Sequence, residues 1–149
     1  MIALLDVNVL VALAWPNHVH HHPARKWFRF QQSQGWATCP STENGFVRVS
    51  SNTLILPEAK SPIEAALLLR ALIALDGHVS WPEETSVLED RRVSLNRIRT
   101  HRQVTDAHLL ALALLHEGRL ATFDRGILSL VPDGMEAEKA VQLIPQEIC

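Results

Sequence analysis

The N-terminal segment limits the possible folds of this chain more than any other stretch of the sequence. Residues 2–5 form an unbroken apolar segment of strand length that ends at a carboxylate, Asp6, and a second apolar stretch follows. Strands without polar alternation are typical of parallel sheets that are covered on both faces. In open α/β sheets ligands bind beyond the carboxyl ends of the strands, where Asp6 would lie. Asp6 could equally be a simple cap of the next helix, since Asp is a favoured N-cap residue.

Segments typical of strands and of helices alternate along the rest of the chain. Further strands are predicted at residues 36–39, 78–81, 119–123 and 141–144. Helices are predicted at residues 7–15, 20–34, 42–50, 63–75, 105–117 and 125–130. Pro62 at a helix start, and Gly77 and Gly118 just past helix ends, agree with these boundaries. The pattern predicts one α/β domain over residues 1–149, with a mainly parallel sheet of about five strands.

Composition restricts the class of protein further. A chain of 149 residues that is 47% hydrophobic and 20% charged is typical of one globular domain. The net charge of −2 excludes a global positive field, so binding to nucleic acid would need a local basic patch. Cys39 and Cys149 are too few for a disulfide framework. No segment has the pattern of a signal peptide or the length of a membrane span, so we expect a cytoplasmic protein without a membrane partner.

Four acidic residues are expected at one edge of the predicted sheet. They are Asp6, Glu43, Asp106 and Asp124. Each could merely stabilise a helix N-terminus, but strand ends and helix starts share one edge of a parallel sheet, so the four carboxylates could converge. Clustered carboxylates repel unless cations neutralise them, and an all-oxygen set suits Mg²⁺ or Mn²⁺. Such ions activate water and stabilise charge on a phosphodiester.

Four short motifs surround these acids. They are LLDVNVL at residues 4–10, STE at residues 41–43, VTDAHL at residues 104–109 and ATFD at residues 121–124. Their order and spacing over residues 1–130 resemble the PIN-domain ribonucleases, above all the VapC-type toxins of bacterial toxin–antitoxin systems. The resemblance implies a three-layer α/β/α fold, with residues 131–149 outside the motifs as a loop and a terminal strand. It also implies a Mg²⁺- or Mn²⁺-dependent endoribonuclease that cuts structured RNA, either tRNA or rRNA.

The resemblance also implies roles for individual residues. Asp6, Glu43, Asp106 and Asp124 match the acidic quartet around the metal. Asp6 and Asp106 would be direct ligands, whereas Glu43 and Asp124 would bind a second ion or act through water. Asn8 and Thr122 match supporting polar positions.

Partners are implied by the same resemblance. A homodimer is expected, bound to a VapB-like antitoxin whose tail lies in a groove near the acids. Aromatic and proline side chains are candidates for lining that groove, and they could equally be ordinary core or surface residues. They are Trp15, Pro16, Trp27 and Phe46.

Two further clusters have both a functional and a structural interpretation. The basic residues before Asp106 are Arg91, Arg92, Arg97, Arg99 and Arg102. They could grip RNA phosphates or form a solvated face that pairs with the acids of residues 83–90. The histidines are His18, His20, His21 and His22, which could bind a metal but are more typical of a solvated helix start.

Alternative functions remain open at this point. A phosphoryl-acceptor domain also places an Asp after its first strand, but the segment Asp6-Val7-Asn8 lacks the second acid of that motif. Nucleotide-binding glycine motifs are absent from the sequence. Among PIN-type enzymes, an RNA maturation or decay nuclease is the alternative to a toxin, and the small size of the chain favours the toxin.

Overall fold

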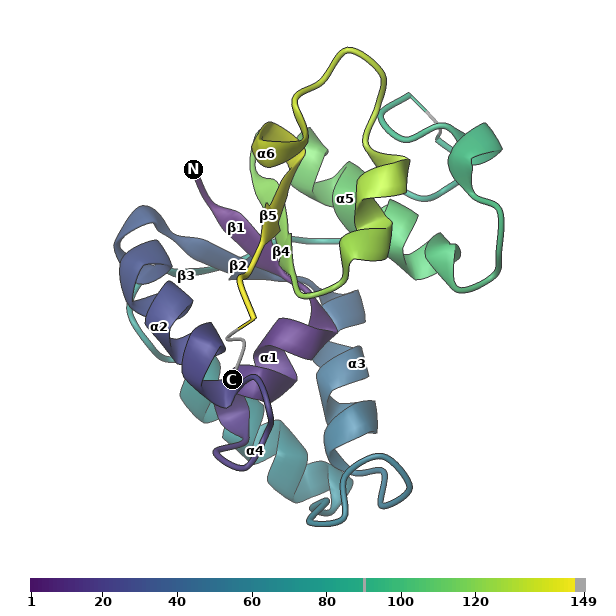
Figure 1. Ribbon diagram of the computed structural model, residues 1–149. Helices are drawn as coiled ribbons and strands as arrows, with labels where there is room; N and C mark the ends of the chain where they lie inside the picture. The colour runs from purple at the N-terminus through teal and green to yellow at the C-terminus, as the bar shows by residue number, and fades with distance from the viewer. Residues whose placement is uncertain (90, 147–149) are drawn as a thin grey trace.

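A sheet of five parallel strands is the centre of the fold (Figure 1). The computed structural model describes residues 1–89 and 91–146. The strands are β1 (Ala3–Leu5), β2 (Trp36–Thr38), β3 (His78–Ser80), β4 (Arg119–Thr122) and β5 (Val141–Leu143), in the spatial order β3-β2-β1-β4-β5. The predicted α/β fold is confirmed, and every strand pair is parallel.

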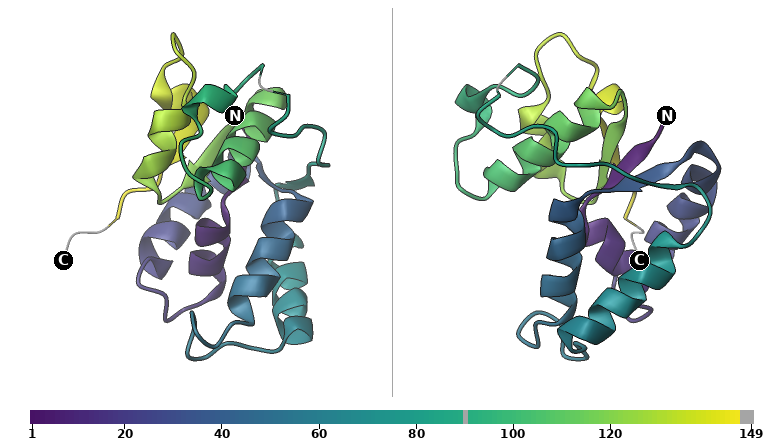
Figure 2. Two further views of the ribbon diagram at one scale, coloured as in Figure 1. Left: turned by 90° about the vertical axis from the view of Figure 1, so that its right-hand side faces the viewer. Right: turned by 180° about the vertical axis from the view of Figure 1, so that it is seen from behind.

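Helices cover both faces of the sheet and give three layers (Figure 2). One layer contains α1 (Val7–Ala14), α2 (His21–Gln31), α3 (Pro40–Ser50) and α4 (Pro62–Ile73). The other contains α5 (Gln103–Leu115), the 3₁₀-helix η3 (Arg125–Leu130) and the short α6 (Ala137–Ala140). Two further 3₁₀ turns are η1 (Gln32–Gln34) and η2 (Leu95–Arg97).

The central strand explains why the N-terminal segment is apolar throughout. Leu4 packs into the core beneath α5, whereas Ala3 and Leu5 pack into the core beneath α1 to α4. All three side chains are fully buried. Burial on both faces removes any need for polar alternation, and each buried leucine stabilises the fold by about 1.5–3 kcal/mol.

Helix α4 shows how local sequence signals set an element boundary. The Ser61 hydroxyl accepts a hydrogen bond from the Glu64 N–H at 3.3 Å, and the Glu64 carboxylate accepts one from the Ser61 N–H at 3.1 Å. Pro62 occupies the first helical position, where its missing N–H costs no hydrogen bond. At the other end Gly77 adopts φ +85°, and a Cβ there would lie 2.2 Å from the Gln32 carbonyl oxygen. The chain therefore needs glycine at this turn.

Several predicted details differ from the structure. The helix predicted over residues 20–34 ends at Gln31 and continues as the 3₁₀ turn η1, and residues 125–130 form a 3₁₀-helix. The four candidate groove residues do not share one surface. Phe46 is fully buried, and Trp15 is buried with its Nε1–H donating to the Ser50 hydroxyl at 3.1 Å. Trp27 lines a separate pocket with Pro23 and Phe30. Phe46 is thus a core aromatic, whereas Trp15 is largely buried and also lines a small pocket with Asn17 and Leu56.

The order of the strands creates a site for ligands. From β1 the chain proceeds to β2 and β3 on one side, and later to β4 and β5 on the other. The side of the sheet to which strands are added changes between β1 and β4. Such a switch point leaves a crevice at the carboxyl ends of its two strands. Asp6 follows β1 and Asp124 lies two residues beyond the end of β4.

The buried position of Leu4 predicts a large loss of stability in Leu4→Ala. We expect the free energy of unfolding to fall by about 2–5 kcal/mol in urea titrations, because the truncation leaves a cavity in the core. Leu54→Ala is the matched control, since Leu54 is 95% exposed. Its unfolding free energy should stay within about 0.5 kcal/mol of the parent value. Equal effects at the two positions would contradict the core assignment of β1.

Candidate active site

Asp6 serves both as a helix cap and as part of the crevice. Its Oδ1 accepts a hydrogen bond from the Val7 N–H at 2.7 Å, which caps α1. Its Oδ2 accepts from the Thr122 hydroxyl of β4 at 2.8 Å and from the Asn8 amide at 3.4 Å. Asp6 can therefore be both a helix cap and a site residue, because Oδ1 caps α1 while Oδ2 contacts the polar side chains of the crevice.

A polar network ties Asp6 to Asp124. The Asn8 Nδ2 donates to Thr122 Oγ1 at 3.1 Å, and the Asn8 Oδ1 accepts from the Phe123 N–H at 3.3 Å. Thr122 Oγ1 also accepts from the Asp124 N–H at 3.1 Å. Asn8 and Thr122 thus contact the side chain of Asp6 and the backbone that leads to Asp124. The Asp124 Oδ1 itself accepts from the Gly126 N–H at 2.8 Å, which caps η3.

Asp106 completes a group of three carboxylates. Asp6, Asp106 and Asp124 line the same pocket of about 600 Å³. Burial, and then the charges of Asp6 and Asp124, raise the pKa of Asp106 to about 6. Burial also raises the pKa of Asp6 and Asp124 adds to the rise, against hydrogen bonds from Thr122 and Val7 that lower it. The three acids therefore interact electrostatically across one pocket.

Glu43 occupies a neighbouring position. It lies in the first turn of α3 and its Oε2 accepts a hydrogen bond from the Thr38 hydroxyl at 2.7 Å. The His78 Nε2 lies 2.8 Å from the same hydroxyl. Because the one hydroxyl proton goes to Glu43, His78 must donate to Thr38. Glu43 is not among the described residues that line the acidic pocket. The structure thus gathers three predicted acids and holds the fourth beside the end of β2.

The donor set fits a hard, partly hydrated cation. Carboxylate oxygens and an amide are ligands that suit Mg²⁺ or Mn²⁺. Among the described residues, no group of three or more His, Cys, Asp or Glu side chains is arranged to hold a metal ion by itself. Mg²⁺ keeps several waters and often binds through one or two carboxylates together with substrate phosphate. The raised carboxyl pKa values show that ionising these acids in one pocket is unfavourable, and a bound cation would lower that cost.

The remaining wall of the pocket is largely apolar. It includes Val7, Val11, Val19, Val49, Ile55 and Leu56, with Asn17 and His18 at its polar margin. The pocket therefore has an acidic end and an apolar side.

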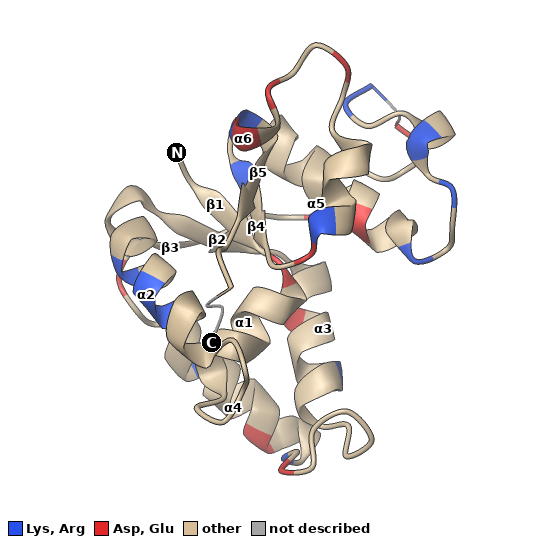
Figure 3. Ribbon diagram, in the orientation of Figure 1, with Lys and Arg blue, Asp and Glu red and all other residues tan. Residues whose placement is uncertain are grey.

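The five arginines lie apart from the pocket lining. None of Arg91, Arg92, Arg97, Arg99 and Arg102 is among the described residues that line it. Arg97 forms an ion pair with Asp133 at 2.5 Å and donates to the Ser129 carbonyl at 3.3 Å. Figure 3 shows basic residues along the segment before α5 at the outer edge of the molecule, whereas acidic residues meet where β1 and β4 end. Asp90, one proposed ion-pair partner, lies outside the described residues.

The histidine cluster is tied into the fold. The His20 ring stacks on Phe123, with centroids 4.8 Å apart, and the His20 N–H donates to His18 Nδ1 at 3.0 Å. The His21 Nδ1 lies 2.7 Å from the Ala12 carbonyl oxygen. His18, His20 and His21 are half-buried, so this helix start is less solvated than the sequence predicted. His18 alone reaches the margin of the acidic pocket, which the sequence analysis did not predict.

Comparison with known proteins decides the family. The family model of the PIN domain matches residues 3–132. Ribonuclease VapC39 of Mycobacterium tuberculosis is 45% identical over 135 residues, which are 91% of this chain and 97% of the relative. Ribonuclease VapC38 of the same organism is 50% identical over 128 residues, 86% of this chain and 89% of the relative. This chain belongs to the PIN-domain family, among the VapC ribonucleases. A third such relative, Ribonuclease VapC44, is 47% identical over 89% of this chain and 93% of its own length.

The family assignment confirms the resemblance found in the motifs. The matched range contains all four VapC motifs and ends before β5, which the structure adds to the edge of the sheet. Within the described part of the chain, no helix has both the length and the apolar character of a membrane span.

The crowded acids predict an unusual pH dependence of stability. A carboxyl whose pKa rises on folding costs stability once the unfolded state ionises, so the cost of Asp106 develops from about pH 4 to pH 6 and persists above. Without divalent cations, Asp106→Asn should therefore unfold at higher urea concentration near pH 7, by on the order of 1 kcal/mol after solvent screening. The difference should vanish below about pH 4, near the ordinary pKa of Asp. A variant less stable than the parent at pH 7 would contradict this electrostatic account.

Proposed function

We propose that this VapC ribonuclease is a Mg²⁺- or Mn²⁺-dependent endoribonuclease that cleaves structured RNA, tRNA or rRNA, as the toxin of a toxin–antitoxin pair. The observation that carries the proposal is the meeting of Asp6, Asp106 and Asp124 in one pocket at the β1–β4 switch point. The ribonuclease names of relatives at 45% and 50% identity support the RNA substrate.

Each acid has a role that follows from its surroundings. Asp6 and Asp106 would hold the cation directly, because burial raises the pKa of both carboxyl groups and a nearby positive charge would offset that cost. Asp124 and Glu43 would act on a second ion or through bound water, since Asp124 is exposed and Glu43 is not among the described residues that line the pocket. The bound cation supplies an activated water and stabilises charge on the phosphodiester. Thr122 and Asn8 would orient Asp6 through their hydrogen bonds to its Oδ2.

Removal of one carboxylate or of the metal tests the proposal. The purified protein, free of partners, is incubated with total cellular RNA in Mg²⁺ or Mn²⁺. We expect discrete products that disappear with EDTA and fall roughly a hundredfold or more in Asp6→Asn, because a metal ligand stabilises several kcal/mol of transition-state charge. Asp76→Asn is the control, since Asp76 is an exposed acid outside the pocket.

The possible outcomes separate the alternative functions. Cleavage that survives both EDTA and Asp6→Asn would reject metal-dependent hydrolysis at this site. Cleavage without growth arrest on expression would favour an RNA maturation or decay nuclease. Absence of cleavage together with labelling of Asp6 by a small phosphodonor would favour the phosphoryl-acceptor alternative.

RNA is proposed to reach the site along the basic segment. Arg91, Arg99 and Arg102 are exposed, and Arg92 and Arg97 are half-buried. Phosphate contacts of this kind position a nucleic acid without reading its sequence.

If these exposed arginines contact RNA phosphates, the affinity for RNA depends on the salt concentration. Arg99→Ala with Arg102→Ala should raise KM for RNA with little change in kcat. The dependence of log KM on log salt concentration should become shallower by up to about 1.5, since each phosphate contact to a single strand contributes about 0.7. Steady-state cleavage at several salt concentrations measures this slope. An unchanged KM would place the RNA elsewhere.

Protein partners complete the proposal. The acidic end and apolar side of the pocket suit a VapB-like antitoxin that presents a cationic side chain beside apolar residues. Association of two copies into a homodimer is proposed from the resemblance to other VapC toxins.

A further inference from the structure

The segment after β3 links the two helices that carry Glu43 and Asp106. Its first residue, Trp81, extends the pairing with β2, because its N–H donates to the Thr38 carbonyl at 2.9 Å. The Trp81 ring stacks on His116 at the end of α5, with centroids 4.3 Å apart and planes inclined by 7°. Seen from behind, the segment crosses from the edge of the sheet towards α5 (Figure 2).

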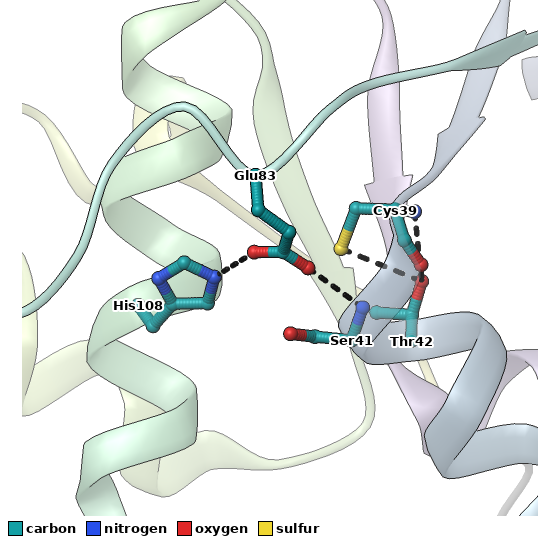
Figure 4. A network of polar contacts seen from close by, with 5 residues as sticks. All are labelled: Cys39, Ser41, Thr42, Glu83 and His108. Carbon is teal, nitrogen blue, oxygen red and sulfur yellow. Dashed lines mark hydrogen bonds and ion pairs between the residues drawn. The ribbon is translucent and has the colours of Figure 1, made fainter.

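Glu83 in this segment contacts both helices at once (Figure 4). Its Oε1 accepts a hydrogen bond from the Ser41 N–H at 2.6 Å, and its Oε2 pairs with the His108 Nε2. Ser41 is the second residue of α3, where backbone N–H groups have no partner within the helix. A carboxylate at this position also faces the positive end of the helix dipole.

The carboxylate of Glu83 is held in its charged form. Burial would raise its pKa, but hydrogen bonds from Ser41 and the pairing with His108 outweigh burial and lower the pKa. The side chains of Glu83 and His108 are 27% and 16% exposed, so the contact is partly shielded from water. The bridge is thus a charged, directional link between α3 and α5.

The bridge lies outside the acidic pocket. Ser41 precedes Glu43 by two residues, and His108 follows Asp106 by two residues. Two residues turn an α-helix by about 200°, so His108 projects from the opposite side of α5 to Asp106. Glu83 is not among the described residues that line the pocket. It therefore acts on the acids only through the helices that carry them.

We propose that Glu83 is a positioning residue that fixes the start of α3 against α5, and thereby the placement of Glu43 relative to Asp106. This inference rests on the proposed metal-dependent cleavage. Glu43 lies in the first turn of α3 and Asp106 in the first turn of α5, so their separation depends on how the two helix starts are held. Among the described contacts of the segment, only those of Glu83 join α3 to α5 through one side chain.

The neighbouring residue supplies a matched control. Glu84 comes from the same segment and its Oε1 lies 3.2 Å from the His116 Nε2, at the far end of α5. No described contact joins Glu84 to α3. Glu84→Ala therefore removes a Glu–His pair and an equal charge without releasing the helix that carries Glu43.

The test compares Glu83→Ala, Glu83→Gln and Glu84→Ala with the parent protein. Mn²⁺ binding is measured by titration calorimetry, and kcat and KM by RNA cleavage. Glu83→Ala should weaken Mn²⁺ binding and lower kcat by about tenfold each, at the lower end of what loss of an outer supporting contact costs at metal sites. KM for RNA should stay unchanged. Glu83→Gln keeps an acceptor for the Ser41 N–H and should recover most of the loss, and Glu84→Ala should match the parent.

Each alternative result has a definite meaning. Parent-like Mn²⁺ affinity and kcat in Glu83→Ala would overturn the inference while the proposed function stands. Equal losses in Glu83→Ala and Glu84→Ala would also overturn it, because the segment would then matter only for stability. Should Glu83→Ala fail to fold, a folded His108→Ala variant takes its place, because it also removes the contact between Glu83 and α5. Parent-like Mn²⁺ affinity and kcat in His108→Ala would then overturn the inference. A parent protein that neither binds Mn²⁺ nor cleaves RNA would reject the proposed function and this inference together.

Discussion

The pairing of β1 with β4 is the interaction on which the candidate site depends. Leu5 lies opposite Ala121, and the ladder continues beyond the strand because the Asp6 N–H donates to the Ala121 carbonyl at 3.0 Å. This register sets the Thr122 hydroxyl against the Asp6 carboxylate and brings Asp124 to the same edge. A shift of one residue would exchange the two faces of β4, burying Thr122 in the wrong core and removing it from Asp6.

The site imposes an electrostatic cost that the core must offset. Burial and mutual repulsion raise the pKa of Asp106 to about 6, so ionising it near neutral pH works against folding. The fully buried residues of both cores, such as Leu4 and Leu5, supply the opposing stabilisation. Natural proteins often retain such destabilising groups where function needs them. A divalent cation bound beside these carboxylates would offset this repulsion.

Much of the fold and part of the site could be predicted from the sequence, for a definite physical reason. Apolar strands followed by acids indicate a parallel sheet and the edge where its strands end, and this rule predicted the positions of Asp6 and Asp124. Asp106 was predicted from its place at the start of an apolar helix. The rule did not predict where the Glu43 side chain points. Its carboxylate accepts a hydrogen bond from Thr38 at the end of β2, and Glu43 is not among the described residues that line the acidic pocket. The rule applied equally to Glu83, which follows β3, but the acidic run after β3 resembles an ordinary surface loop in sequence. Its contacts with Ser41 and His108 are long-range and leave no local pattern.

The shape of the pocket bears on how one site can serve both catalysis and inhibition. The proposed hydrolysis of a phosphodiester uses the acidic residues, but nothing in that chemistry requires the apolar residues that line the same pocket, Val11, Val49, Ile55 and Leu56. An apolar wall stabilises a bound segment that carries apolar side chains, which RNA backbone lacks. A cationic side chain from such a segment would neutralise the same carboxylates that otherwise need metal ions. The proposed inhibitor and the proposed cation would therefore bind at the same carboxylates, and the apolar residues of the pocket would contact only the inhibitor.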